Sequence, residues 1–258
     1  MTAEVSIFEQ VAASAPRYLM RLALIEKMLD AMPRPPSKFL EIGPGMGDVS
    51  IYVAKRFPQS TGTLLDFSEE SSNVLRERIR GLERLSLAVG DFMEYAVRGS
   101  YDLVIACEVL EHIEDDRAAF AKIASVLSPD GCLICSVPAF MSKWQLVDQY
   151  AGHHRRYERR EVVEKLAASA LSMDRLWCYG FPITGLTYFI RQAYYRGRLR
   201  KFSGTMEQAT KRSGVERPLA GVFRRLRLDR LLRPFFWVQY LARDTDLGDG
   251  FIVLARRG

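Results

Sequence analysis

The chain lacks the features that mark secreted and membrane-spanning proteins. Its 258 residues include only four cysteines, which form no disulfide framework and indicate a reducing compartment. Glu4 and Glu9 lie near the N-terminus without an apolar core segment, so no signal peptide is predicted. Residues 176–190 carry no charge, but this stretch is too short for a membrane-spanning helix and suits an interfacial or buried segment.

Metal-binding patterns are scarce as well. Cys132 and Cys135 form a C-x-x-C, yet they lie in the apolar run CLICSV, which predicts a strand. Residues three apart on a strand point to opposite faces, and no second Cys or His pair accompanies these two. We therefore predict two core cysteines and no metal site. The three histidines, at positions 112, 153 and 154, are the candidates for a histidine base.

The stretch that organises the chain is K-F-L-E-I-G-P-G-M-G-D, at 38–48. A short apolar run precedes Gly43, Gly45 and Gly47, and a helix-like pattern follows them. A strand, a glycine turn and a helix form the opening unit of a nucleotide-cofactor fold, because glycine permits a positive φ and a close approach of the ligand. An ordinary tight turn between a strand and a helix is the plain alternative.

The spacing of the glycines disfavours a dinucleotide. The dinucleotide fingerprint is G-x-G-x-x-G, whereas here the third glycine comes one residue early and Asp48 follows it. Glu41 would also place a carboxylate near any phosphate, so a cationic ligand such as an amino group or a sulfonium fits better. E-x-G-x-G-x-G resembles the first motif of the class I S-adenosylmethionine-dependent methyltransferases, which implies S-adenosylmethionine as the cofactor.

Acidic residues follow the next two predicted strands. Asp66 ends the strand predicted at 61–65, where a carboxylate can accept hydrogen bonds from ribose hydroxyls, and Phe67 is placed to cover the adenine face. In the methyltransferase family, an acidic residue at the position of Asp91 meets the adenine amino group, and its neighbour, here Phe92, packs on the ring. A solvated turn aspartate is the plain alternative for Asp91.

The later motifs follow in the family's order. A strand at 101–107 leads into C-E-V-L-E-H, a helix at about 114–127, the turn S-P-D-G and an apolar strand at 132–137. This series is similar to the methyltransferase pattern over residues 36–140. The resemblance implies that the cofactor contacts Glu41, Gly43, Gly45, Gly47, Asp66, Phe67, Asp91, Phe92, Cys107 and Glu108.

The segment G-H-H-R-R-Y, at 152–157, precedes a predicted helix. G-H-x-R-x-Y resembles a subgroup of small-molecule methyltransferases that includes the quinone-biosynthesis type, in which it lies near the mouth of the active site. We predict catalytic roles for His153, His154 and Tyr157, with His153 as the first choice of base for an oxygen acceptor. A basic segment held by salt bridges is the structural alternative.

Alternating strands and helices predict an α/β fold. We expect a Rossmann-like, seven-stranded, mostly parallel sheet with helices on both faces and an antiparallel last strand. Residues 1–36 form a predicted helical lead-in, which Pro16 divides into two helices. The cofactor-binding core comprises 37–180 and 246–258, and 181–245 form a helical cap inserted before the last strand.

Positive charge is concentrated in this cap. Residues 191–233 carry thirteen Lys and Arg against three acidic residues, a local net charge of +10 in a chain whose total is +6. Within the cap, residues 224–237 mix arginines with large apolar residues, as a membrane-surface patch requires. The same composition suits RNA phosphates or an anionic substrate, and a basic cap that only packs over the site is a further alternative.

These patterns predict methyl transfer to a small acceptor that is lipophilic or membrane-associated, such as a quinol or a polyprenyl compound. The alternatives are an RNA methyltransferase that uses the basic insertion, and a non-catalytic cofactor-binding protein that docks on membranes. Nucleic acid is disfavoured as a partner because C-E-V-L stands where the N/D-P-P-Y/F tetrapeptide would be. We expect a cytoplasmic location, with peripheral contact to an anionic membrane if the cap binds lipid, and leave the oligomeric state open.

Overall fold

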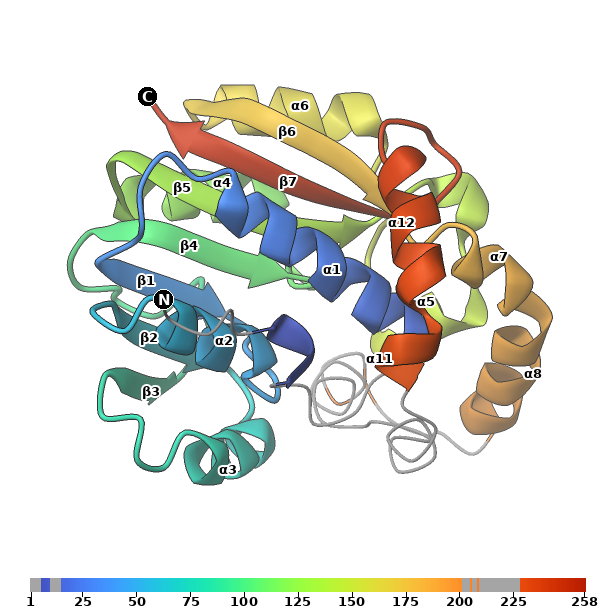
Figure 1. Cartoon of the computed structure of the whole chain (residues 1–258), viewed down its shortest axis with the longest axis horizontal. Coiled ribbons are helices and arrows are strands. Elements are labelled where there is room, and N and C mark those ends of the chain that lie inside the picture. Colours follow the sequence, from blue (N-terminus) through green and yellow to red (C-terminus); the bar gives the residue numbers. More distant parts are fainter. Residues whose placement is uncertain (1–5, 10–14, 201–204, 206–207, 209–227) are drawn as a thin grey trace.

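A single sheet of seven strands forms the centre of the computed structural model, which describes residues 6–9, 15–200, 205, 208 and 228–258 (Figure 1). The strand order is β3-β2-β1-β4-β5-β7-β6. The strands are β1 (Lys38–Ile42), β2 (Thr61–Asp66), β3 (Leu85–Val89), β4 (Tyr101–Cys107), β5 (Leu127–Pro138), β6 (Leu171–Tyr179) and β7 (Gly250–Arg257). Only β7 runs antiparallel to its neighbours. The predicted fold class is confirmed.

Helices cover both faces of the sheet, and each face has its own apolar cluster. The longer helices are α1 (Pro16–Asp30), α2 (Asp48–Arg56), α3 (Glu69–Arg78), α4 (Asp116–Val126), α6 (Arg159–Ala168), α8 (Tyr188–Leu199) and α12 (Arg233–Leu241). The shorter helical segments are η1 (Ile7–Glu9), η2 (Leu110–His112), η3 (Met141–Lys143), α5 (Leu146–Ala151), α7 (Ile183–Leu186) and α11 (Leu228–Leu231). Apolar residues of α1, α2 and α3 pack on one face, and those of α4 and α6 pack on the other.

The cysteines of β5 show this division. Cys132 belongs to the cluster under α1, whereas Cys135 belongs to the cluster under α4, and each side chain is 1% exposed. Residues three apart on a strand therefore point to opposite faces here, as the alternation of side chains requires. The prediction of two core cysteines is confirmed.

Two predicted boundaries were wrong. The turn predicted at 128–131 lies within β5, because Leu127 still pairs with Tyr101 and pairing resumes at Cys132 opposite Leu103. The four residues between them form an irregularity in the ladder, in which Asp130 has a φ of 59°. The helix predicted at 68–82 ends at Arg78, and the chain turns at Gly81, where φ is 82°.

Helix α1 of the lead-in lies across one face of the sheet, whereas the described helices of the cap lie toward the carboxyl ends of β4 and β5 (Figure 1). Pro16 is the first residue of α1, a position where its missing N–H costs nothing. Helix α1 contacts both α7 and α12. Within the described residues, no helix combines the length and the apolar character needed to cross a membrane. Much of the basic segment, including 209–227, lies outside the described residues, and the division into lead-in, core and cap stays a prediction.

Candidate functional site

The glycine turn lies at the carboxyl end of β1, where the order of the strands reverses. β1 pairs with β2 on one side and with β4 on the other, and open α/β sheets bind their ligands at such a point. At Gly43, where φ is 63°, an added Cβ would lie 2.7 Å from Val109 Cγ2. At Gly47, where φ is 72°, it would lie 2.4 Å from Leu75 Cδ1. The turn therefore requires glycine at both positions.

A cavity of about 310 Å³ opens beside this turn. Its wall combines the turn with residues of α1, η2, α5 and α8 and with the segment that follows β4. The predicted cofactor residues that line it are Glu41, Gly43, Gly45, Cys107 and Glu108. The predicted residues outside this lining are Gly47, Asp66, Phe67, Asp91 and Phe92. The cofactor assignments as a set stay a prediction.

Asp66 connects the end of β2 with the glycine turn. Its Oδ2 accepts a hydrogen bond from the Gly45 N–H at 3.3 Å, and its Oδ1 accepts bonds from the Ser68 N–H at 2.9 Å and the Ser71 hydroxyl at 2.6 Å. An ionised carboxylate offers about four acceptor positions, so Asp66 retains capacity for a ligand hydroxyl. This geometry is compatible with the predicted ribose contact.

The residues predicted around the adenine differ in exposure. Phe67 is 37% exposed, and Asp91 is exposed, with its Oδ1 accepting a hydrogen bond from the Met93 N–H at 2.7 Å. Phe92 is only 5% exposed and packs in the core, with the Lys122 ammonium 5.1 Å from its ring centroid. Phe92 therefore shapes the loop after β3 from inside the core, whereas Phe67 is partly exposed at the surface.

Glu108 is the centre of a partly buried ion network. It has a φ of 57°, its Oε2 lies 2.7 Å from Arg17 Nη1, and its Oε1 lies 3.7 Å from Arg21 Nη1. The Tyr179 hydroxyl donates to the same Oε1 at 2.7 Å. Burial opposes ionisation of Glu108, but the two guanidinium charges outweigh it and hold its pKa well below the usual range.

The arginines of this network were not predicted from the sequence. Arg17 also lies 3.0 Å from Asp249 Oδ1, and Arg191 of α8 lies 3.4 Å from Asp249 Oδ2. The network therefore ties α1 and α8 to the turn before β7, across the cavity. Arg17 and Arg21 are four residues apart and share one helical face, which was the available signal, but nothing in the pattern indicates their partners.

Glu41 is buried beneath the glycine turn, with 3% of its surface exposed. The Ser50 hydroxyl of α2 donates to its Oε2. Burial raises the pKa of Glu41 to about 8, although the Ser50 hydrogen bond acts in the opposite direction. A cationic ligand in the cavity would favour the ionised form.

The stability of the protein should depend on pH through Glu41. Between about pH 4.5 and pH 8 the folded chain keeps a proton on Glu41 that the unfolded chain loses, so stability falls as pH rises through this window. Glu41→Gln removes this titration. As pH rises through this window, the free energy of unfolding of the variant should therefore increase relative to that of wild type by up to about 1.4 kcal/mol per pH unit. Urea denaturation at pH 5, 6, 7 and 8 measures this difference. Parallel pH profiles would refute this account of Glu41.

The three predicted catalytic residues lie in different surroundings in the structure. His153 lines the cavity, and its Nδ1 lies 2.9 Å from Asp148 Oδ1. His154 is exposed outside the lining, and Tyr157 is fully buried and donates its hydroxyl hydrogen to Asp116 Oδ2 at 2.8 Å. Burial and the Asp116 charge raise the pKa of Tyr157. Of the three, His153 alone borders the cavity, and the catalytic assignments stay predictions.

Asp148 joins His153 to a buried arginine. Its Oδ2 lies 2.8 Å from Arg156 Nη2, and both side chains are 2% exposed or less. Burial opposes ionisation of Asp148, but the hydrogen bond to His153 and the Arg156 charge outweigh it and lower its pKa. The His153 ring is therefore held by a charged carboxylate.

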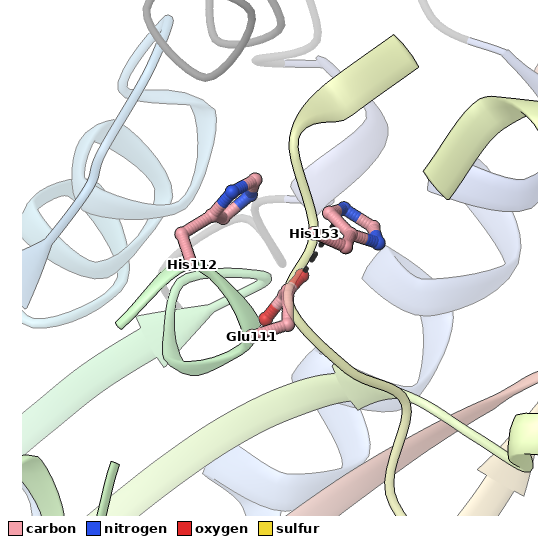
Figure 2. Close-up of side chains that lie close together, drawn as sticks. All are labelled: Glu111, His112 and His153. Atoms are coloured by element: carbon pink, nitrogen blue, oxygen red, sulfur yellow. Dashed lines mark ion pairs between the residues drawn. The ribbon is translucent and has the colours of Figure 1, made fainter. Parts of the chain in front are cut away.

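A second histidine and a buried carboxylate lie beside His153 (Figure 2). The rings of His112 and His153 are 4.8 Å apart and nearly perpendicular. Burial and the neighbouring His153 lower the pKa of His112 to about 3. Burial and the charge of Glu108 raise the pKa of Glu111. Burial also raises the pKa of Cys107 to about 12, so its thiol is a poor nucleophile.

The chain resembles known methyltransferases over part of its length. A family profile described as a methyltransferase domain matches residues 40–133, which span the glycine turn, Asp66, Asp91 and Glu108. A malonyl-acyl-carrier protein O-methyltransferase of Methylococcus capsulatus is 28% identical over 149 residues, covering 55% of this chain and 54% of the relative. The chain thus spans about half of that relative's length.

Two solved structures share the fold at low identity. The N-methyltransferase NodS of Bradyrhizobium japonicum, in complex with S-adenosylhomocysteine, aligns with a TM-score of 0.51 and 16% identity over 91% of this chain and 83% of NodS. The cyclase SpnF aligns with a TM-score of 0.58 and 14% identity over 91% of this chain and 79% of SpnF. Since one neighbour is a cyclase, the fold alone does not determine the reaction.

Proposed function

We propose that this chain, which belongs to the class I S-adenosylmethionine-dependent methyltransferases, transfers a methyl group from S-adenosylmethionine to an oxygen of a small, lipophilic acceptor. S-adenosylmethionine is the cofactor of the family. The observation that carries the proposal is the cavity itself, which is lined by the glycine turn and also by His112 and His153. One space thus adjoins the predicted cofactor turn and a pair of imidazoles suited to hold an acceptor.

The reaction needs little from the protein beyond alignment and exclusion of water. The cofactor supplies a methyl group on a positively charged sulfur, which is a good leaving group. Glu41, Gly43 and Gly45 would hold the cofactor on one side of the cavity. On the other side His153, whose Nδ1 is held by Asp148, would accept the proton that the acceptor hydroxyl loses as its oxygen takes the methyl group. Arg17 and Glu108, which form an ion pair at 2.7 Å, both line the cavity and would help to hold the two reactants in line.

The acceptor class is inferred from the surface of α7 and α8. Leu186, Phe189 and Ile190 are 68%, 81% and 73% exposed. Beside them an open groove of about 660 Å³ is lined by Phe189 and by the exposed Arg196 and Arg200. Helix α8 also contributes residues to the wall of the 310 Å³ cavity beside the glycine turn. Apolar side chains beside arginines suit a lipophilic acceptor drawn from an anionic membrane.

The membrane part of this proposal can be tested by sedimentation with anionic vesicles. Replacing Phe189 and Ile190 together with serine should weaken vesicle binding at least tenfold, since each large apolar side chain contributes about 1.5–3 kcal/mol when buried. Val163→Ser on α6, where the valine is 36% exposed, is the matched control and should bind as wild type. If wild type stays in the supernatant at low salt, the membrane proposal is wrong.

The acceptor itself can be found with methyl-labelled S-adenosylmethionine. The panel should contain lipophilic phenols, prenyl compounds, RNA and, because a relative is named for malonyl-acyl-carrier protein, a carboxylate carried on that protein. We expect label in a lipophilic phenol or prenyl compound. Label in RNA alone would contradict the proposal, and cofactor binding without transfer to any acceptor would favour a non-catalytic role.

A further inference from the structure

Arginines outnumber ionised carboxylates around the 310 Å³ cavity. Among the described residues, the guanidinium groups in its lining belong to Arg17, Arg21, Arg156 and Arg191. The carboxyl groups in its lining belong to Glu41, Glu108 and Asp148, and Asp249, outside the lining, pairs with two of the arginines. Burial raises the pKa of Glu41 to about 8, so this residue is uncharged at neutral pH. With the histidines neutral, four positive charges face three negative ones, which favours a negatively charged ligand.

Arg191 of α8 is only partly neutralised by the protein. Its side chain is 19% exposed, and its ion partner among the described residues is Asp249, at 3.4 Å from Nη1. Arg17 shares the Asp249 carboxylate and lies closer to it, at 3.0 Å. A guanidinium offers five N–H donors, so Arg191 retains donors for a ligand in the cavity.

Arg21 is the other arginine with a distant partner, at 3.7 Å from Glu108 Oε1. Its charge lowers the pKa of both Glu41 and Cys107, although burial outweighs this effect at each of them. Arg21 therefore acts on the side of the glycine turn, where the cofactor is assigned. This leaves Arg191 as the arginine for the acceptor.

Tyr195 provides a second donor beside Arg191. The two residues lie one helical turn apart on α8, and both line the cavity. Burial raises the pKa of Tyr195, and the charge of Arg191 acts in the opposite direction, as expected of close neighbours. Within the described part of the chain, the Tyr195 hydroxyl has no hydrogen-bond partner. A guanidinium and a hydroxyl side by side can both donate to one carboxylate.

Three tyrosine rings form the cavity wall next to this pair of donors. Tyr150 of α5 lies 5.3 Å from Tyr195, and Tyr194 lies 5.1 Å from it, measured between ring centroids. Arg198 donates to the Tyr194 hydroxyl at 3.0 Å and to the Tyr150 hydroxyl at 3.4 Å, which holds the two rings in place. Aromatic rings pair favourably at such distances, so this wall suits a flat aromatic ligand.

We propose that the cavity binds an aromatic acceptor that carries a carboxylate, and that Arg191 and Tyr195 hold this carboxylate. The proposal rests on the proposed function and narrows its acceptor to a phenol with one charged group and a lipophilic substituent. The tyrosine wall packs on the ring, and the phenol hydroxyl lies toward His153. A neutral phenol leaves Arg191 without this partner, so Arg191 determines acceptor specificity.

Calorimetry with three matched probes tests the proposal. The probes are an alkyl-substituted hydroxybenzoate, its methyl ester, and the alkylphenol that lacks the carboxylate. Each is titrated into the full chain, alone and with S-adenosylhomocysteine, which fills the cofactor site without allowing reaction. We expect the acid to bind at least about tenfold more tightly than the ester or the phenol, because a hydrogen bond to a charged group strengthens binding by this factor or more.

Variants of α8 identify the residue responsible for this preference. Arg191→Gln should weaken binding of the acid by about 10–100-fold and leave binding of the ester unchanged. Arg191→Lys keeps the charge and should restore most of the preference, and Tyr195→Phe should weaken acid binding by less than about tenfold. The control is Arg196→Gln, which removes the same charge from the same helix outside the cavity lining and should bind all three probes as wild type.

Equal affinity for the acid, the ester and the phenol would overturn the proposal, as would no binding of the acid. Loss of acid and ester binding to the same extent in Arg191→Gln would contradict it too, because a merely structural role of Arg191 predicts that result. Binding of S-adenosylhomocysteine is measured in the same experiment and judges the proposed cofactor. The titrations on the chain alone judge the carboxylate site, so the two proposals can fail separately.

Discussion

Replacing Asp66 with alanine should weaken S-adenosylmethionine binding by at least about a hundredfold. A hydrogen bond to a charged group contributes about 1.5–3 kcal/mol, and the predicted contact with two ribose hydroxyls would involve two of them. Each 1.4 kcal/mol corresponds to a factor of about ten in the dissociation constant. Isothermal calorimetry at neutral pH measures the change directly.

A control variant is needed because Asp66 also supports the protein around it. Its Oδ1 accepts a hydrogen bond from the Ser71 hydroxyl at 2.6 Å, and its Oδ2 accepts one from the Gly45 N–H. Ser71→Ala removes one bond at Asp66 and leaves the carboxylate in place, so it should lower affinity by less than about tenfold. Unchanged binding in a folded Asp66→Ala variant would disprove the predicted ribose contact.

Replacing Asp148 with alanine should destabilise the protein by about 3–5 kcal/mol. Asp148 and Arg156 form an ion pair in which both side chains are 2% exposed or less. The variant leaves the Arg156 charge buried without its carboxylate and removes a hydrogen-bond partner of His153. Urea denaturation at pH 7 should show the loss, and the melting temperature should fall by roughly 6–20 °C.

The matched control for Asp148 is an ion pair at the surface. Asp246 is 58% exposed and lies 2.7 Å from Arg159 Nη2, so solvent screens the interaction. Asp246→Ala should therefore cost less than about 1 kcal/mol. If both variants lose the same stability, burial is not what gives the Asp148–Arg156 pair its importance.

The fold could be predicted because its signals are local. The glycine turn after an apolar run predicted the first strand and helix, and the alternation of strands and helices predicted the parallel sheet. The antiparallel β7 and its apolar run at 250–257 were predicted as well. The boundaries that failed, at 128–131 and after Arg78, depend on pairing and backbone geometry that residue types alone do not indicate.

The site could be predicted only in part because its contacts join distant residues. Arg17 donates a hydrogen bond to Asp249, which lies 232 residues later in the sequence. His153 lies beside Glu111, although 41 residues separate them in the sequence. The G-H-H-R-R-Y segment indicated a site, yet it did not indicate which side chains face the cavity. Tyr157 turns inward because Asp116 accepts its hydroxyl hydrogen in the core.

Glu111 was missed for a different reason. It lies next to His112 in C-E-V-L-E-H, a segment whose resemblance to the family pattern drew attention to Glu108. Periodicity cannot show that a carboxylate is buried without a hydrogen-bond donor, because that property depends on every element packed around it. In the structure, Glu111 Oε1 lies 3.8 Å from His153 Nε2.

Calorimetry with S-adenosylmethionine and S-adenosylhomocysteine, with NAD as the control, tests the central claim most directly. The glycine spacing, the buried Glu41 and the family match all predict that the first two bind in the micromolar range and that NAD does not. Binding of NAD alone, or of none of the three to the folded chain, would contradict the account.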